Sequence, residues 1–255
     1  MMTSTLLSFL ILVNAQTPVN TPTDPKAMLD QMTKAYSTYQ TLTMVCINSA
    51  HDANQTQSSS DASIKTNLLI QRPNLFRLEQ TDRTGAQVRS TLVVSTGKKL
   101  YLPYGGQNIG REAPAEMTDM LRNFEKMLSD SGLPLMLILS PPSDIDRFYK
   151  YLSNLKTVTR QKIDTQDVDV ISADYKNSKG VEGSMEFYIG VKDHLLRRLV
   201  VKVKAALIDT EPKVGADPIQ TLNNEALIYE WNMRYTLNPK FEAGTFKAPP
   251  GALSL

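Results

Sequence analysis

The sequence has few residues of the kinds that build catalytic or metal centres. Its 255 residues include one cysteine, Cys46, and two histidines, His51 and His194. A single cysteine excludes an intramolecular disulfide and a metal site built on paired cysteines. The sequence also has no nucleophile elbow, phosphate-binding loop, dinucleotide fingerprint or His-x-x-x-His pattern. We therefore predict that the protein is not an enzyme, and we expect no catalytic residues, no metal and no cofactor.

Clustered charge and aromatic residues are also scarce. The chain has 28 Lys and Arg residues against 26 Asp and Glu, for a net charge of +2, and only 7% of its residues are aromatic. Phosphate binding needs clustered basic side chains, and single-strand binding needs aromatic stacking platforms. These shortages exclude a nucleic-acid partner. The hydrophobic share of 41% is sufficient for a complete core.

No hydrophobic run is long enough to span a bilayer. The apolar run from Leu6 to Val13 fits the core of an export signal instead. Val13-Asn14-Ala15 then places small residues where a signal peptidase cleaves, although Met1 to Thr5 lack the usual basic residue. We predict an export signal over residues 1–15, a Thr- and Pro-rich tether over 16–24 and a single domain over 25–255. The mature chain is expected to start at Gln16 and to be soluble in the periplasm.

A proline-directed bend organises the first group of predicted strands. Pro73 has no N–H and forces the preceding residue into an extended conformation. We therefore expect strands from Ile64 to Arg72 and from Leu75 to Gln80 on either side of the bend. A second pair, Gln87 to Ser95 and Lys98 to Tyr104, continues a curved antiparallel meander. The glycine-containing stretch that follows, Gly105 to Pro114, is predicted to be a loop.

One helix and one further predicted strand, Thr41 to Ala50, precede these strands, and three helices follow them. Asp24-Pro25 predicts a helix start, with Asp as N-cap and Pro in the first turn. The apolar residues that follow recur at helical spacing: Met28, Leu29, Met32, Tyr36 and Tyr39. The mid-chain helices are predicted over Glu116 to Ser129, Leu133 to Leu139 and Ser143 to Leu155. Because Leu133 to Leu139 is apolar on every side, this helix is either wholly buried or lines a site for an apolar ligand.

A second block of predicted strands completes the domain. It comprises Thr157 to Ile163, Asp167 to Tyr175, Ser184 to Ile189, Leu195 to Ala205 and Leu222 to Leu237. The order helix, strands, helices, strands predicts an α+β fold. We expect a half-open, strongly curved antiparallel β-barrel of about ten or eleven strands, with helices covering its hollow face.

Two features permit a catalytic reading beside a structural one. Cys46 lies in a predicted strand, where a buried small hydrophobic role is favoured over that of a nucleophile. Asp167 and Asp169 share one strand face and could act as an acid/base pair or as metal ligands. We favour a solvated face for this pair. His51 and His194 are both expected to be solvated.

Four motifs resemble those of the LolA-type family of periplasmic carriers that sort outer-membrane lipoproteins. Arg72-Pro73-Asn74-Leu75-Phe76 resembles the family's Arg-Pro-Asn-(Leu/Lys)-Phe motif, and Ser95 to Tyr101 resembles its Ser-Asp-Gly-Lys-x-Leu-Trp/Tyr turn and strand. Pro134 to Ile138 is similar to its apolar mid-chain helix, and Phe246 to Ala252 to its C-terminal Phe-x-x-x-Pro-Pro-x-Gly ending. The motifs occur in the family's order.

The sequence also departs from the family pattern. Thr96 replaces the usual Asp of the turn, and Pro103 interrupts the strand that follows it. The second half of the domain, Thr157 to Pro239, is longer than that of the carriers. The resemblance is therefore to the broad LolA-like superfamily, of which the true lipoprotein carriers are one part.

The resemblance implies a hydrophobic cavity that holds acyl chains of a lipoprotein or lipid, with the helices as a lid. It assigns Arg72 a role in lid closure and ligand handover. Independently, alternation along the curved strands gives candidate lining residues: Phe76, Leu78, Leu92, Val94, Leu100, Leu135, Ile138, Phe187, Ile189, Leu199 and Val201. A buried CH₂ contributes about 0.8 kcal/mol, so one acyl chain can bind without polar contacts.

Three functions follow from these observations. The favoured one is a monomeric, non-enzymatic periplasmic carrier, which exchanges lipoprotein or lipid with inner- or outer-membrane partner proteins during outer-membrane lipoprotein sorting or envelope biogenesis. The second is an envelope signalling or regulatory module of the same fold, which senses lipid or binds a partner protein. The third is a hydrolase, which would need a polar cleft that brings His194 together with a Ser and an Asp.

Overall fold

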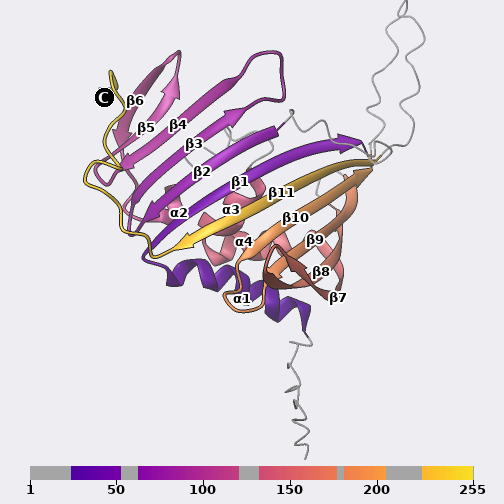
Figure 1. The fold of residues 1–255 in the computed structure, drawn as a ribbon. Helices are drawn as coiled ribbons and strands as arrows, with labels where there is room; N and C mark the ends of the chain where they lie inside the picture. Colours follow the sequence, from indigo (N-terminus) through magenta and orange to yellow (C-terminus); the bar gives the residue numbers. More distant parts are fainter. Residues whose placement is uncertain (1–23, 53–62, 121–131, 177–180, 205–225, 255) are drawn as a thin grey trace, which may run out of the picture.

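The computed structural model describes residues 24–52, 63–120, 132–176, 181–204 and 226–254 (Figure 1). The predicted export signal lies outside these residues, as does the tether up to residue 23. Within the described part of the chain, no helix combines the length and hydrophobicity needed to cross a membrane.

One large curved sheet forms the molecule. Its strands in chain order are β1 (Thr41–Asp52), β2 (Ser63–Gln71), β3 (Leu75–Asp82), β4 (Arg89–Thr96), β5 (Lys99–Tyr104), β6 (Gln107–Glu112), β7 (Leu152–Ile163), β8 (Gln166–Lys176), β9 (Glu182–Gly190), β10 (Leu196–Lys204), β11 (Ala226–Leu237) and β12 (Leu253–Ser254). The spatial order is β12-β6-β5-β4-β3-β2-β1-β11-β10-β9-β8-β7. The pairing of β1 with β11 joins the two meanders, and the outer strands β7 and β12 do not close the sheet.

The helices lie on one face of this sheet and fill its hollow (Figure 1). They are α1 (Pro25–Thr38), α2 (Met117–Met120), α3 (Gly132–Leu139) and α4 (Pro142–Tyr149). As predicted, the Asp24 side chain caps α1 by accepting a 2.9 Å hydrogen bond from the backbone N–H of Lys26. The predicted fold class is confirmed: eleven antiparallel strands and the two-residue parallel β12 form an open, curved sheet.

Two local predictions were wrong. The stretch Gly105 to Pro114 contains β6, because Gly105 and Gly106 form a two-residue hairpin turn with φ values of +57° and +80°. Two consecutive positive φ angles suit a tight hairpin, and glycine adopts them without a steric penalty. The helix predicted over Ser143 to Leu155 ends at Tyr149, and β7 begins at Leu152. The predicted helix from Glu116 is observed as α2, and residues 121–129 lie outside the described chain.

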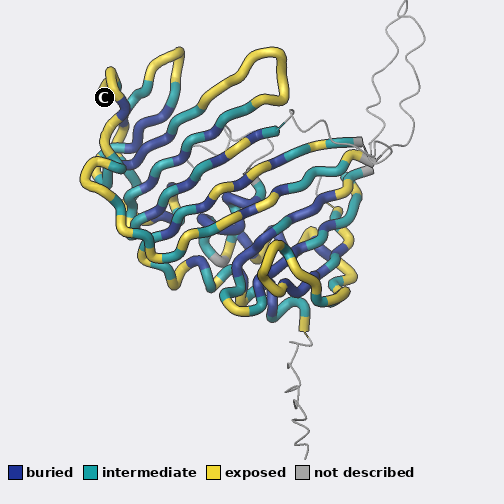
Figure 2. Tube along the Cα trace, in the orientation of Figure 1, coloured by how far each residue is buried: buried dark blue, intermediate teal, exposed yellow. Residues whose placement is uncertain are grey.

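The main core lies between the helices and the concave face. Figure 2 shows dark blue and teal segments alternating along the central strands, as expected for a sheet with one buried face. The largest fully buried side chains come from both layers: Leu29, Met32 and Tyr36 from α1, with Phe76 from β3 and Phe187 from β9. A smaller cluster on the opposite face contains Val168, Val170, Tyr188 and Val200.

A buried hydrogen-bond chain fixes α1 to the sheet. The Tyr235 hydroxyl donates to the carbonyl of Leu196 (2.8 Å), so the Tyr36 hydroxyl is the donor in the 2.9 Å contact with Tyr235. The Tyr36 hydroxyl in turn accepts a 3.0 Å bond from the N–H of Leu196. Each polar atom thus has a partner, so the chain can be buried without an unsatisfied group. Burial raises the pKa of both Tyr36 and Tyr235.

The buried ionisable groups predict that stability falls at alkaline pH. Burial raises the pKa of Cys46 from 9.0 to about 12 and that of Tyr149 from 10.0 to about 12. A group whose pKa is higher in the folded state stabilises fully below its unfolded pKa, and this contribution is lost as pH rises toward the folded value. We expect the free energy of unfolding to decline from about pH 9, where the unfolded-state Cys46 thiol begins to ionise.

A Cys46→Ala variant tests the origin of this decline. Without the thiol, the decline is expected to begin near the ordinary tyrosine pKa of 10.0. Urea titrations of both proteins at a series of pH values measure the onset. Equal slopes for the two proteins between pH 9 and pH 10 would contradict the assignment to Cys46.

Candidate functional site

The structure gathers nine of the eleven predicted lining residues into one core. These are Phe76, Leu78, Leu100, Leu135, Ile138, Phe187, Ile189, Leu199 and Val201. All nine have exposed fractions of 5% or less. They come from β3, β5, β9 and β10, in both halves of the sheet, and from α3, so the curvature brings distant parts of the sequence together around the helices.

Leu92 and Val94 lie on the other face of the sheet. In the β3–β4 register Leu78 pairs with Val93, while Arg77 pairs with Val94. Directly paired residues share a face, so Val93 and not its neighbours joins the main core. The prediction assigned Leu92 and Val94 to the concave face, one residue out of register, and a shift of one residue exchanges the two faces of a strand.

The helix α3 occupies the hollow that the sheet creates. Its eight residues, Gly132–Leu139, contain no charged side chain, and Leu135, Leu137 and Leu139 are each 1% exposed. Leu133 and Met136 are partly buried against the same core. The structure shows this apolar segment buried, and the residues at its C-terminal end, Ile138 and Leu139, also line a pocket.

A pocket of about 300 Å³ opens at the seam between α3 and the other helices. Its apolar wall is formed by Ile138, Leu139 and Ile145. Polar residues line the rest: Asp30, Thr33, Lys34, Ser37, Arg72, Thr118, Ser140, Asp146 and Tyr149. Ligand pockets typically measure about 300–1,000 Å³, so this one lies at the lower end of the range. An apolar wall beside a polar rim suits an amphipathic ligand.

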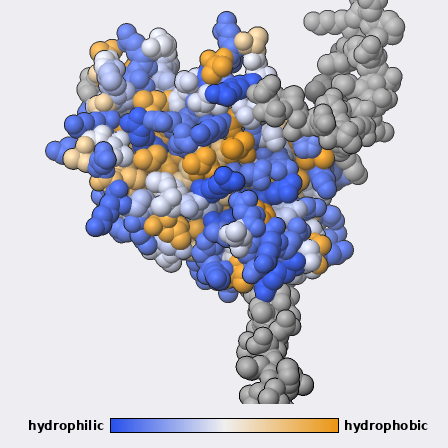
Figure 3. Space-filling model, in the orientation of Figure 1, coloured by the Kyte–Doolittle hydropathy of each residue, from blue (hydrophilic) through white to orange (hydrophobic). Residues whose placement is uncertain are grey.

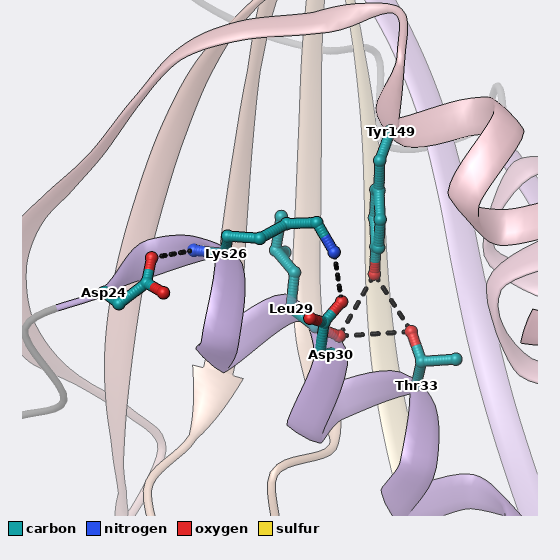
Figure 4. A network of polar contacts seen from close by, with 6 residues as sticks. All are labelled: Asp24, Lys26, Leu29, Asp30, Thr33 and Tyr149. Carbon is teal, nitrogen blue, oxygen red and sulfur yellow. Dashed lines mark hydrogen bonds and ion pairs between the residues drawn. The ribbon is translucent and has the colours of Figure 1, made fainter.

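Tyr149 fixes α4 to α1 at this seam. Its hydroxyl lies 3.0 Å from the carbonyl oxygen of Leu29 and 2.9 Å from the hydroxyl of Thr33 (Figure 4). Thr33 also donates to the Leu29 carbonyl at 3.1 Å. Lys26 lies 4.8 Å from the centre of the Tyr149 ring and 2.5 Å from the Asp30 carboxylate. These contacts close one side of the pocket.

Arg72 lies at the seam and binds the C-terminal end of α1. Its guanidinium donates to the carbonyl of Tyr36 (3.1 Å), in the last turn of α1, and to the carbonyl of Tyr39 (3.2 Å), the residue that caps the helix. Carbonyls at a helix C-terminus have no partner within the helix. The Arg72 backbone N–H also donates to the Gln40 carbonyl at 2.9 Å. A cation near a helix C-terminus satisfies free carbonyls and is favoured by the helix dipole. Burial lowers the pKa of Arg72, and the nearby Glu116 opposes this shift.

This geometry predicts that Arg72 stabilises the end of α1. We expect Arg72→Leu to lower the free energy of unfolding by about 1–3 kcal/mol, because two carbonyls lose charged hydrogen bonds. Amide hydrogen exchange in the last turn of α1 is expected to accelerate. Arg72→Lys is the matched control, since it keeps the charge but lacks the planar guanidinium that reaches both carbonyls. Unchanged exchange in Arg72→Leu would contradict this role.

The structure also places the candidate catalytic residues. Cys46 is 3% exposed, which agrees with the buried role favoured from the sequence. Asp169 is 4% exposed and is held by Arg160 through bonds of 2.8 and 3.0 Å, so the predicted solvated face is wrong for this residue. Its partner Asp167 is exposed. His51 is the next-to-last residue of β1, and His194 lies in the turn before β10 with a φ of +56°.

Sequence reasoning missed the polar residues of the seam. Thr33 and Tyr149 were not predicted to meet, because they lie 116 residues apart. Tyr149 belongs to the apolar stripe of its helix, and nothing in that spacing distinguishes a purely apolar contact from a hydroxyl that needs a partner. A buried tyrosine hydroxyl usually finds one, which was the available signal.

Comparisons with known proteins give a family and several similar folds. The family model DUF2092, described as a predicted periplasmic protein, matches residues 25–253. No curated protein matches significantly. LprF from Mycobacterium bovis matches with a TM-score of 0.47 and 14% identity, over 89% of this chain and 97% of that chain.

Two further solved structures have more distant folds. The MucA/MucB complex of Pseudomonas aeruginosa matches with a TM-score of 0.44 and 9% identity, over 89% of this chain and 61% of that chain. A LolA superfamily protein from Nitrosomonas europaea matches at 0.30 and 8% identity, over 88% of this chain and 97% of that chain. Since the family model spans 25–253, the chain belongs to the DUF2092 family of predicted periplasmic proteins.

Proposed function

We propose that this protein is a non-enzymatic periplasmic binder of acyl chains, carried by a lipid or a lipid-modified protein. The observation that carries the proposal is the all-apolar helix α3 in the hollow, with a pocket of about 300 Å³ at its seam. An acyl chain entering at Ile138 and Leu139 would meet the same apolar surface that α3 covers. If the acyl chain displaced α3, the concave face of the sheet would contact the acyl chain in place of the apolar helix.

The energetics support a ligand without many polar contacts. Ten buried methylene groups contribute about 8 kcal/mol at about 0.8 kcal/mol each. This gross value corresponds to a dissociation constant of about 1 μM before the cost of moving α3 is subtracted. A closed resting state in which α3 fills the hollow suits a carrier, which must both take up and release its ligand.

The chemistry of the described residues supports binding over catalysis. Cys46 is buried, and its raised pKa keeps the thiol protonated near neutral pH, whereas the thiolate is the nucleophile. Asp169 is engaged by the Arg160 guanidinium and is not among the residues that line the seam pocket. The pocket itself combines hydroxyl groups with both acidic and basic side chains around an apolar wall.

Native mass spectrometry tests the proposal directly. The full-length chain, exported and purified from a periplasm, is measured intact and its ligands are then extracted. Co-purified acyl lipid or lipoprotein near one per chain is the expected result. A ligand-free mass, combined with no binding of a fluorescent fatty acid, would overturn the proposal.

A second measurement links binding to the helix seam. Tyr149→Phe removes the hydroxyl that bonds to Leu29 and Thr33 but keeps the ring. Since one such bond contributes about 0.5–1.5 kcal/mol, fatty-acid association is expected to be roughly two- to tenfold faster. Tyr151→Phe is the control, because Tyr151 is 39% exposed and lies outside the pocket lining.

A further inference from the structure

The convex face of the sheet carries an exposed apolar ridge on a central strand. Val45 and Ile47 of β1 are 37% and 46% exposed. The register places Asn67 and Lys65 of β2 beside them on one side, with Arg234 and Asn232 of β11 on the other. Figure 3 shows hydrophobic surface in the middle of this face with hydrophilic surface around it.

Two hollows flank this ridge and share Ile47. One measures about 390 Å³ and is otherwise lined by Ser63, Lys65, Asn67, Thr81 and Arg83. The other measures about 220 Å³ and has Val45, Ile163 and Met233 as apolar lining. Its polar lining includes Arg197, Arg234 and Asp164. The ridge and its two hollows extend across β2, β1 and β11 on the face opposite the helices; we term this whole surface the convex groove.

The charge of the convex groove is one-sided. Its lining contains four basic side chains, Lys65, Arg83, Arg197 and Arg234, against one acidic side chain, Asp164. Among the described residues, Lys65 and Arg83 have no ion-pair partner. Arg234 reaches Asp164 only at 3.4 Å, and both side chains are largely exposed, so this pair is weak.

Arg197 gives the smaller hollow a buried cation. Its side chain is 9% exposed and forms an ion pair with Asp193. Its guanidinium also lies 5.2 Å from the centre of the Tyr235 ring. The Nε atom nevertheless has no hydrogen-bond partner, although it is buried. Tyr235 bonds to Tyr36 of α1 on the helix side of the sheet, so the exposed positive charge of the convex groove comes from Lys65, Arg83 and Arg234.

We propose that the convex groove binds an acidic segment of a partner protein, with apolar side chains in the two hollows and carboxylates at the basic residues. Charge complementarity selects the acidic partner. The two hollows beside Ile47, of about 390 and 220 Å³, can receive side chains of a protein segment, whereas a flat bilayer surface has none to place in them. The site lies across the sheet from the acyl-chain pocket and is independent of it.

A synthetic peptide probe tests the proposal. The probe is a twelve-residue peptide of alternating Glu and Leu, compared with its Lys-Leu counterpart and with phosphatidylglycerol vesicles. Binding to the full chain is followed by calorimetry and by NMR shifts of the Val45 and Ile47 methyl groups. We expect the acidic peptide to bind at least about tenfold more tightly than the basic one, and its affinity to fall with added salt.

Charge-reversal variants supply the matched controls. Lys65→Glu/Arg83→Glu is expected to weaken acidic-peptide binding at least about tenfold. Lys192→Glu/Lys240→Glu makes the same change in net charge at exposed sites outside the convex groove and is expected to leave binding unchanged. Equal binding of both peptides, or equal binding by both variants, would overturn the proposal. Vesicle binding without peptide binding would also overturn it, in favour of a membrane surface.

Discussion

Ile138→Trp is expected to weaken binding of a fluorescent fatty acid at least about tenfold while the protein remains folded. Ile138 lies on α3, is 5% exposed and forms part of the apolar wall of the seam pocket. A larger ring at this position projects into the pocket of about 300 Å³. The entry point of the ligand is thereby filled by the protein itself.

The physical reason is a competition for one small apolar space. A methylene group gains about 0.8 kcal/mol on burial, and loss of two or three such contacts weakens binding about tenfold or more. The tryptophan ring also adds contacts between α3 and its neighbours, which opposes displacement of the helix. Both effects act in the same direction on affinity.

Ile138→Leu is the matched control for this substitution. It keeps the side-chain volume and is expected to change affinity little, because volume-conserving exchanges in cores usually cost less than about 1.5 kcal/mol. Urea denaturation of both variants checks that each is folded. Wild-type affinity in a folded Ile138→Trp protein would show that the ligand does not enter at this seam.

The sequence predicted the faces of most strands because alternation is a local property. Phe76 and Leu78 were assigned correctly, since a strand that covers a core must direct alternate residues inward. The same reasoning failed at Leu92 and Val94, where three consecutive residues, Leu92, Val93 and Val94, are all apolar. In such a run, apolar character does not show which residues face the core. Only the pairing with β3 decides which residue faces the helices.

Other features depend on contacts that no local pattern encodes. The seam pocket is formed where α1, α3 and α4 meet, and its closure depends on the contact of Tyr149 with Thr33, far apart in sequence. Arg72 was singled out through a resemblance that implied a role in ligand handover. The structure adds a structural role, because its guanidinium binds the carbonyls at the end of α1.

The placement of α3 links the architecture to the proposed function. A strongly curved sheet creates a concave apolar surface that must be covered, and α3 covers it without charged residues of its own. A helix of this kind gains stability only from burial, since its sequence provides no ion pair within it. Its position is therefore sensitive to any apolar molecule that competes for the same surface.

Phe187→Ala is expected to lower the free energy of unfolding by about 3–5 kcal/mol. Phe187 on β9 is fully buried and belongs to the same core as α3. Removing its ring loses the burial energy and leaves a cavity that neighbouring side chains fill only in part. Leu92→Ala is the control: Leu92 lies half-exposed on the opposite face, so its loss is expected to cost about 1 kcal/mol.

The same pair of variants separates a ligand-lining residue from an ordinary core residue. If Phe187 lines the surface that an acyl chain contacts, saturating fatty acid fills part of the new cavity, and an apolar cavity accepts such a guest. Ligand then stabilises Phe187→Ala at least as much as the wild type, by the mass-action relation between affinity and stability. For Leu92→Ala the added stability is expected to equal that of the wild type. A Phe187→Ala protein that loses fatty-acid stabilisation while Leu92→Ala keeps it would contradict this filling of the cavity. An equal cost of unfolding for both variants would contradict the assignment of the two faces.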